Sequence, residues 1–293
     1  MSEFSENTHA FLTIAQKEFQ TVIRTKRFLI FGTIFVLLAL IGAYYGNTDL
    51  TRSISPTSGA PNPITQPINY VISIAFSYSQ IILTILALAL SYDALTRERS
   101  ERTLVQLLVR PLKRSTILFG KFVANLVAIG GFFVATTLIL YIGLSLITRK
   151  VPSSGDINYL FISMGVMLLY IMVFIAIGLL ISSLTRTSLD SLLGAVFVWI
   201  LLLILTYAGV ALGLNAIHSG ATADIPYTTF PGYAKTLLWI NPGSHNVAIQ
   251  SLAGDFSKFT TGLSYAANVI LLFVSIIIPF LLAVYFFKRS DAV

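Results

Sequence analysis

Long uninterrupted apolar stretches dominate the pattern of this chain. Six segments contain no Asp, Glu, Lys or Arg, and each can hold the ~20 apolar residues that cross a hydrocarbon core about 30 Å thick. The apolar positions are continuous and do not alternate with polar ones, which favours helices over the strands of a membrane barrel. We therefore predict an all-α membrane protein with a single transmembrane domain over 1–293. Its six expected spans lie near 28–45, 70–91, 118–147, 159–182, 191–214 and 265–287.

Two shorter segments flank these spans. Residues 9–27 place apolar side chains at helical spacing, which predicts an amphipathic elbow helix that lies in the membrane interface and then turns into the first span. A solvated amphipathic helix is the alternative. Residues 216–264 form the largest expected external loop, and prolines divide it. Its apolar pieces at 234–240 and 244–252 are too short to span, and we expect re-entrant or interfacial helices there.

Composition and charge agree with a membrane location. The chain is 56% hydrophobic and only 11% charged, whereas about a quarter of residues are charged in a soluble domain. If the N-terminus is cytoplasmic, fourteen of the nineteen Lys and Arg fall in inside segments, so the positive-inside rule predicts a multi-pass cell-membrane protein with both termini in the cytoplasm. The net charge of +7 indicates attraction to anionic membrane lipids, and nucleic acid is not an expected partner.

The sequence offers little reactive chemistry. It has no cysteine, no H-E-x-x-H, no G-x-S-x-G and no phosphate-binding loop, and the three histidines flank the spans without ligand spacing. No ionisable residue is expected deep within a span, where such residues usually mark proton or ion pathways. We therefore expect no catalytic residue, metal site or cofactor in this chain, and we do not expect an enzyme.

A row of small and polar side chains follows one face of the second span. Ser73, Ser77, Gln80 and Thr84 recur at intervals of three and four residues, which places them on the same side of a helix. Lipid does not favour such a face, so it contacts another helix or lines a cavity. Plain helix packing and a translocation surface are both consistent with this pattern.

An island of charge separates the second and third expected spans. Seven of the nineteen Lys and Arg lie between Asp93 and Lys121, and three leucines share one face of a short helix that ends at Pro111. The charges could serve as a topology anchor. Mixed signs beside an apolar face also suit a docking surface for another protein. The three leucines are Leu104, Leu107 and Leu108.

This island resembles the first cytoplasmic loop of permease subunits from ATP-binding-cassette transporters of the type-two export family. The rest of the chain agrees with that family in outline, with the elbow, the six spans, a short second inner loop at 182–190 and re-entrant material near Asn241. One residue departs from the pattern, because Arg102 stands where the family commonly has Gly. The pattern is Glu98-x-x-x-x-Thr103-Leu104-x-x-Leu107-Leu108-x-x-Pro111-x-x-Arg114, followed by Gly120-Lys121.

The resemblance implies a permease that pairs with a second permease chain and rests a coupling helix, within 93–115, on a separate ATP-binding subunit. ATP and Mg would be bound by that partner. Alternatives are a non-transporting scaffold or assembly protein, or an ion-coupled secondary transporter. The cargo stays open among lipids, hydrophobic peptides, antibiotics and glycans. The resemblance assigns ATPase docking to Glu98, Glu101, Arg102, Leu104, Leu107 and Leu108, with a minor second contact at Thr185, Arg186 and Thr187.

Overall fold

Helices are the only regular secondary structure among the residues that the computed structural model describes. Six of its helices are long and apolar enough to cross a membrane, which confirms the predicted fold class. Each predicted span falls within one of them. They are α2 (Lys26–Ile54), α3 (Pro67–Ser91), α6 (Arg114–Thr148), α7 (Ser154–Leu184), α8 (Ser188–Asn215) and α11 (Tyr265–Arg289). The structure describes residues 3–54, 67–100, 114–149, 151–215, 232–254 and 261–289.

Four shorter helices complete the described part of the chain. Two of them occupy the segment before the last span, where the sequence predicts short helices. One of these, α10, is packed against α7 and α11, and it buries Ala248 and Ile249 completely. The short helices are α1 (Glu3–Ile23), α4 (Thr96–Ser100), α9 (Gly232–Ile240) and α10 (Pro242–Gly254).

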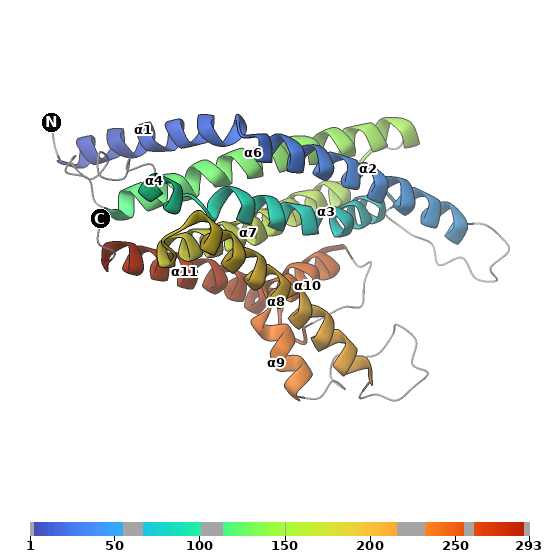
Figure 1. Cartoon of the computed structure of the whole chain (residues 1–293). Helices are drawn as coiled ribbons and strands as arrows, with labels where there is room; N and C mark the ends of the chain where they lie inside the picture. The colour runs from blue at the N-terminus through green and yellow to red at the C-terminus, as the bar shows by residue number, and fades with distance from the viewer. Residues whose placement is uncertain are drawn as a thin grey trace.

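The centre of the bundle is built from α3 and α7. In the most apolar stretch of 18 residues in each of these helices, 61% of the residues are buried. The corresponding share is 11% in α8 and 17% in α11. Around this pair, α2 packs on α3 and α11 packs on α7, whereas α8 diverges from the bundle beside α9 (Figure 1). The outward faces of α8 and α11 are apolar because they meet lipid and not water.

Small residues allow the central helices to approach closely. A Cβ atom on Gly42 would lie 2.7 Å from the Cα atom of Ala75, and one on Gly178 would lie 1.9 Å from the Oγ atom of Ser91. Real Cβ atoms do not come this near, so glycine is required at both contacts. In lipid, where association depends on packing, such contacts hold neighbouring helices together.

One end of the bundle gathers the segments that surround the charge island. The start of α1 and the end of α11 lie at this end together with α4 (Figure 1). The first helix ends at Ile23 and the first span begins at Lys26, with Thr25 Oγ1 accepting a hydrogen bond from the Phe28 backbone N–H at 3.2 Å. α1 packs along α6, and its orientation in the membrane interface stays a prediction.

Candidate coupling and translocation sites

The segment that follows α3 and the turn between α7 and α8 are joined by hydrogen bonds. Ser182 Oγ, at the end of α7, accepts hydrogen bonds from the backbone N–H groups of Leu95 and Thr96 at 2.9 and 3.3 Å. Arg99 donates to the carbonyl oxygen of Thr185 at 2.6 Å. The first loop, where it leaves α3, is therefore fixed to the turn between α7 and α8.

A buried ionic cluster fixes the same root to two further helices. Lys121 Nζ of α6 donates to Glu18 of α1 at 2.9 Å and to Glu98 of α4 at 2.8 Å, and the lysine side chain is only 1% exposed. A buried ammonium needs such partners, because desolvation of an isolated charge is costly. The cluster joins α1, α4 and α6, which the sequence does not place side by side.

The cluster changes the interpretation of one predicted docking residue. Glu98 is buried and bound to Lys121, so its carboxylate is not on an accessible surface. Sequence reasoning treated Lys121 only as part of a motif. A lysine two turns inside an otherwise apolar helix is the signal that could have revealed a buried partner.

The remaining docking candidates divide into two groups. In the turn between α7 and α8, Arg186 and Thr187 are exposed and Thr185 is half-buried. Thr187 Oγ1 donates to Asp190 at 2.7 Å and accepts from its backbone N–H at 3.1 Å, which caps the start of α8. The candidates that lie outside the described residues are Glu101, Arg102, Leu104, Leu107 and Leu108.

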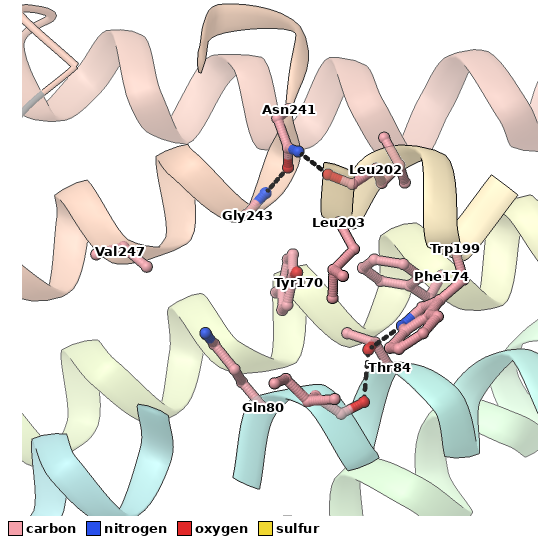
Figure 2. A pocket seen from close by; sticks show the side chains of 11 residues that line it. Gln80, Thr84, Tyr170, Phe174, Trp199, Leu202, Leu203, Asn241, Gly243 and Val247 are labelled. Atoms are coloured by element: carbon pink, nitrogen blue, oxygen red, sulfur yellow. Dashed lines mark hydrogen bonds between the residues drawn. The ribbon is translucent and has the colours of Figure 1, made fainter. Parts of the chain in front are cut away.

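A cavity of about 150 Å³ opens where α8 diverges from the bundle. Figure 2 shows two members of the predicted translocation face, Gln80 and Thr84, lining it opposite Trp199. Trp199 Nε1 donates to Thr84 Oγ1 at 3.0 Å, so α3 and α8 are connected across the cavity. The other lining residues are Ile81, Tyr170, Phe174, Leu202, Leu203, Asn241, Gly243 and Val247.

Amide side chains form the polar part of this cavity wall. Asn241 donates to the carbonyl oxygen of Leu202 and accepts from the N–H of Gly243 at 2.7 Å, which holds the α9–α10 junction against α8 (Figure 2). Gln80 Oε1 accepts from Asn246 Nδ2 at 3.2 Å. Among the described residues, the lining has no Asp, Glu, Lys, Arg or His, so it suits uncharged or weakly polar molecules.

The other two members of the predicted face lie outside this cavity. Ser73 is half-buried and donates to the carbonyl oxygen of Tyr70 at 2.7 Å, and Ser77 is exposed and donates to the carbonyl oxygen of Ser73 at 2.9 Å. Neither residue lines the cavity. Along this one face of α3, Ser73 is therefore half-buried and Ser77 is exposed, and only Gln80 and Thr84 line the cavity.

His245 occupies a different environment from the interfacial one that the sequence suggested. It is 1% exposed, with Nδ1 2.7 Å from Asn268 Oδ1 and Nε2 2.9 Å from the carbonyl oxygen of Trp239. Thr261 Oγ1 also donates to Asn268 at 2.7 Å. The histidine therefore connects α9, α10 and α11, because α10 turns back into the bundle. Among the described residues no group of His, Asp and Glu side chains is arranged to hold a metal ion.

The described part of the chain is an all-helical bundle with six candidate spans, two loops joined by hydrogen bonds, and a cavity whose described lining residues carry no charge. These features suit the membrane-embedded subunit of a transporter. The chain matches the description "ABC-2 family transporter protein" over residues 12–292, and it belongs to this family. Membership makes it a membrane-embedded permease subunit of the ATP-binding-cassette transporter class.

Two curated relatives carry the name "Probable multidrug ABC transporter permease YbhR", one from Escherichia coli strain K12 and one from Escherichia coli O157:H7. Each is 32% identical over 167 residues, which is 56% of this chain and 38% of the relative. The matched part thus spans well under half the length of these relatives.

Proposed function

We propose that this chain forms the translocation pathway of an ATP-driven exporter, as a dimer with itself or with a related permease, and that a separate ATPase drives it through the first inner loop. One observation carries this proposal, namely that the root of that loop is bound to the second inner loop, to α1 and to α6. The bonds that join them involve Arg99, Ser182 and Lys121. A displacement of the loop would therefore move several helices together.

The docking surface of this proposal lies beyond the root. Leu104, Leu107 and Leu108 would seat the loop helix in a groove of the ATPase, and the exposed Arg186 and Thr187 would make a second, smaller contact. An apolar face with a polar rim is the usual anatomy of a protein interface. Glu98 would act from inside the permease, as an anchor of the loop.

The cavity at Gln80, Thr84 and Trp199 is the proposed cargo-facing part of the pathway. Its aromatic and amide walls carry no fixed charge, so they favour apolar or weakly polar cargo over strongly anionic cargo. The word multidrug in the name of the relatives supports small-molecule cargo. In the proposed topology the termini, α4 and the turn at 185–187 face the cytoplasm, because the basic residues gather there.

The decisive experiment is purification of the tagged chain from its native membrane in mild detergent. We expect an ATP-binding subunit to co-purify, and we expect ATP-dependent efflux of an apolar dye after reconstitution with that subunit. The double variant Leu104→Ser/Leu108→Ser should insert normally and lose the ATPase. The matched control is Leu12→Ser on α1, an exposed leucine that should change neither property.

Three results would contradict the proposal. Normal ATPase retention and normal efflux in the double variant would show that the leucines are not the docking face. Efflux that follows an ion gradient without any ATPase would place the chain among secondary transporters. A chain that retains an ATPase and moves no cargo would favour the scaffold alternative.

A further inference from the structure

A polar cleft of about 250 Å³ lies where the elbow helix turns into the first span. It is enclosed by the end of α1, the start of α2, the α3–α4 turn and one side of α6. No step of the proposed transport cycle uses it. Its lining residues are Glu18, Thr21, Val22, Thr25, Lys26, Arg27, Leu90, Asp93, Ala94, Arg97 and Asn125.

Both carboxylates of the cleft are already engaged. Glu18 is bound by Lys121 at 2.9 Å, and Asp93 is bound by Arg27 at 2.7 Å. Arg27 also stacks over the ring of Tyr92, with its guanidinium carbon 5.0 Å from the ring centre. The negative charges of the wall are thus largely compensated within the protein.

Two cations of the cleft have no such compensation. Within the described part of the chain, the side chains of Lys26 and Arg97 make no hydrogen bond and no ion pair. Lys26 is exposed and Arg97 is half-buried, and they approach the cleft from the start of α2 and from α4. Their positive charge is available to an anion that enters between these helices.

A buried amide in the same cleft also lacks a partner. Asn125 of α6 is 3% exposed, and its Oδ1 atom makes no hydrogen bond to any described residue. Buried polar groups in native structures are nearly always satisfied, so an unmet amide indicates a ligand or water at that position. The amide can turn by 180° and present its NH₂ group to an oxygen of an anion.

An apolar groove adjoins the cleft, and it favours the headgroup of a lipid over a free anion as the ligand. It has a volume of about 360 Å³, and Arg27 belongs to the walls of both hollows. A free anion would use only the polar cleft, whereas a lipid would use both. The groove is lined by Phe31, Ile85, Leu88, Ala89, Tyr92, Leu192, Ala195, Val196 and Trp199, with Arg27 at its rim.

We propose that this cleft binds the phosphodiester headgroup of an anionic phospholipid, with Lys26, Arg97 and Asn125 contacting the phosphate and an acyl chain following the apolar groove past Arg27. The lipid would bridge α1, α2, α4 and α6 at the root of the first loop. This inference depends on charge, burial and shape, and it does not depend on the proposed transport cycle.

The test uses the full chain in nanodiscs of phosphatidylcholine that contain a small fraction of dioleoyl phosphatidylglycerol. Lipid retained by the protein after exchange into mild detergent is measured by mass spectrometry. We expect selective, saturable retention of phosphatidylglycerol by the unmodified protein. The variant Lys26→Gln/Arg97→Gln should weaken it about 30-fold, since each basic side chain near anionic lipid contributes roughly 1 kcal/mol.

The matched control is Lys288→Gln/Arg289→Gln, which removes the same charge from exposed residues at the end of α11. This control should retain phosphatidylglycerol as the unmodified protein does. Asn125→Leu should fold, since it replaces an unpaired amide by an apolar group, and should weaken the retention of phosphatidylglycerol, because the phosphate loses one hydrogen-bond donor.

Two outcomes would overturn the proposal. Equal loss of phosphatidylglycerol in the test variant and in the control would show that bulk charge, and not this cleft, attracts the lipid. Equal thermal stabilisation by free glycerol phosphate in pure phosphatidylcholine nanodiscs would show that the occupant is a soluble anion. Neither outcome changes the co-purification of an ATPase, so failure here is distinguishable from failure of the proposed function.

Discussion

Replacement of Lys121 by Met tests how strongly the ionic cluster holds α1, α4 and α6 together. The change leaves an unbranched side chain that is one atom shorter, and it removes the ammonium between Glu18 and Glu98. One carboxylate oxygen of each glutamate lies within 2.9 Å of the lysine nitrogen, so the two oxygens are less than about 6 Å apart. Two negative charges at that distance repel each other by roughly 3 kcal/mol at an effective dielectric constant of ~20. Loss of one partner from a buried ion pair costs about 3–5 kcal/mol.

We therefore expect Lys121→Met to lower the free energy of unfolding by about 3–5 kcal/mol. The measurement is denaturant-induced unfolding of the purified protein in mild detergent, followed by circular dichroism. The triple variant Lys121→Met/Glu18→Gln/Glu98→Gln should recover most of the loss, because neutral amides no longer repel each other. Lys288→Met, an exposed lysine at the same end, should change the stability by less than about 0.5 kcal/mol.

The reasoning fails if Lys121→Met and Lys288→Met unfold at the same denaturant concentration. It also fails if the triple variant is less stable than Lys121→Met alone, since that result would mean that the carboxylates gain stability from something other than the ammonium. In either case the cluster would not be the element that joins α1, α4 and α6.

Three further predictions concern the central contacts. Gly42→Ala should destabilise the protein by about 1–3 kcal/mol in the same unfolding assay, because its new methyl group meets the α3 backbone, whereas Gly143→Ala, with open space around it, should be neutral or slightly stabilising. Trp199→Phe and Thr84→Val should each lower the free energy of unfolding by about 1 kcal/mol, because each removes the same hydrogen bond. The double variant should therefore be little less stable than either single variant, and fully additive losses would contradict this prediction. His245→Phe should lower the free energy of unfolding by about 1–3 kcal/mol, because the buried ring loses its hydrogen bonds to Asn268 and to the carbonyl oxygen of Trp239. An unchanged unfolding midpoint would show that the histidine is not buried there.

The sequence by itself determined the membrane class, the six helices and the presence of two short helices before the last one. These features follow from local properties. A run of ~20 apolar residues must form a helix in lipid, because each backbone N–H and C=O group needs a partner within its own segment. The resemblance to the family could also be found from the sequence alone, since it depends on residues that lie close together in the chain between Glu98 and Lys121.

The sequence could predict the candidate sites only in part. The spacing from Ser73 to Thr84 identified a polar face, but periodicity does not say what that face meets, and only Gln80 and Thr84 reach the cavity. Likewise, Glu98 stands beside other charged residues in the chain, and nothing in its local pattern distinguishes a buried anchor from an exposed docking group.

The tertiary structure decided which distant residues come together. Glu18, Glu98 and Lys121 meet because α1 packs along α6 while α4 turns back towards both, and His245 is buried because α10 enters the bundle between α7 and α11. In lipid the apolar surfaces of helices are nearly equivalent, so hydropathy fixes that a helix spans but not which neighbour it chooses. That choice depends on close contacts such as Gly42 against Ala75 and on buried polar pairs, whose energies exist only once the helices have assembled.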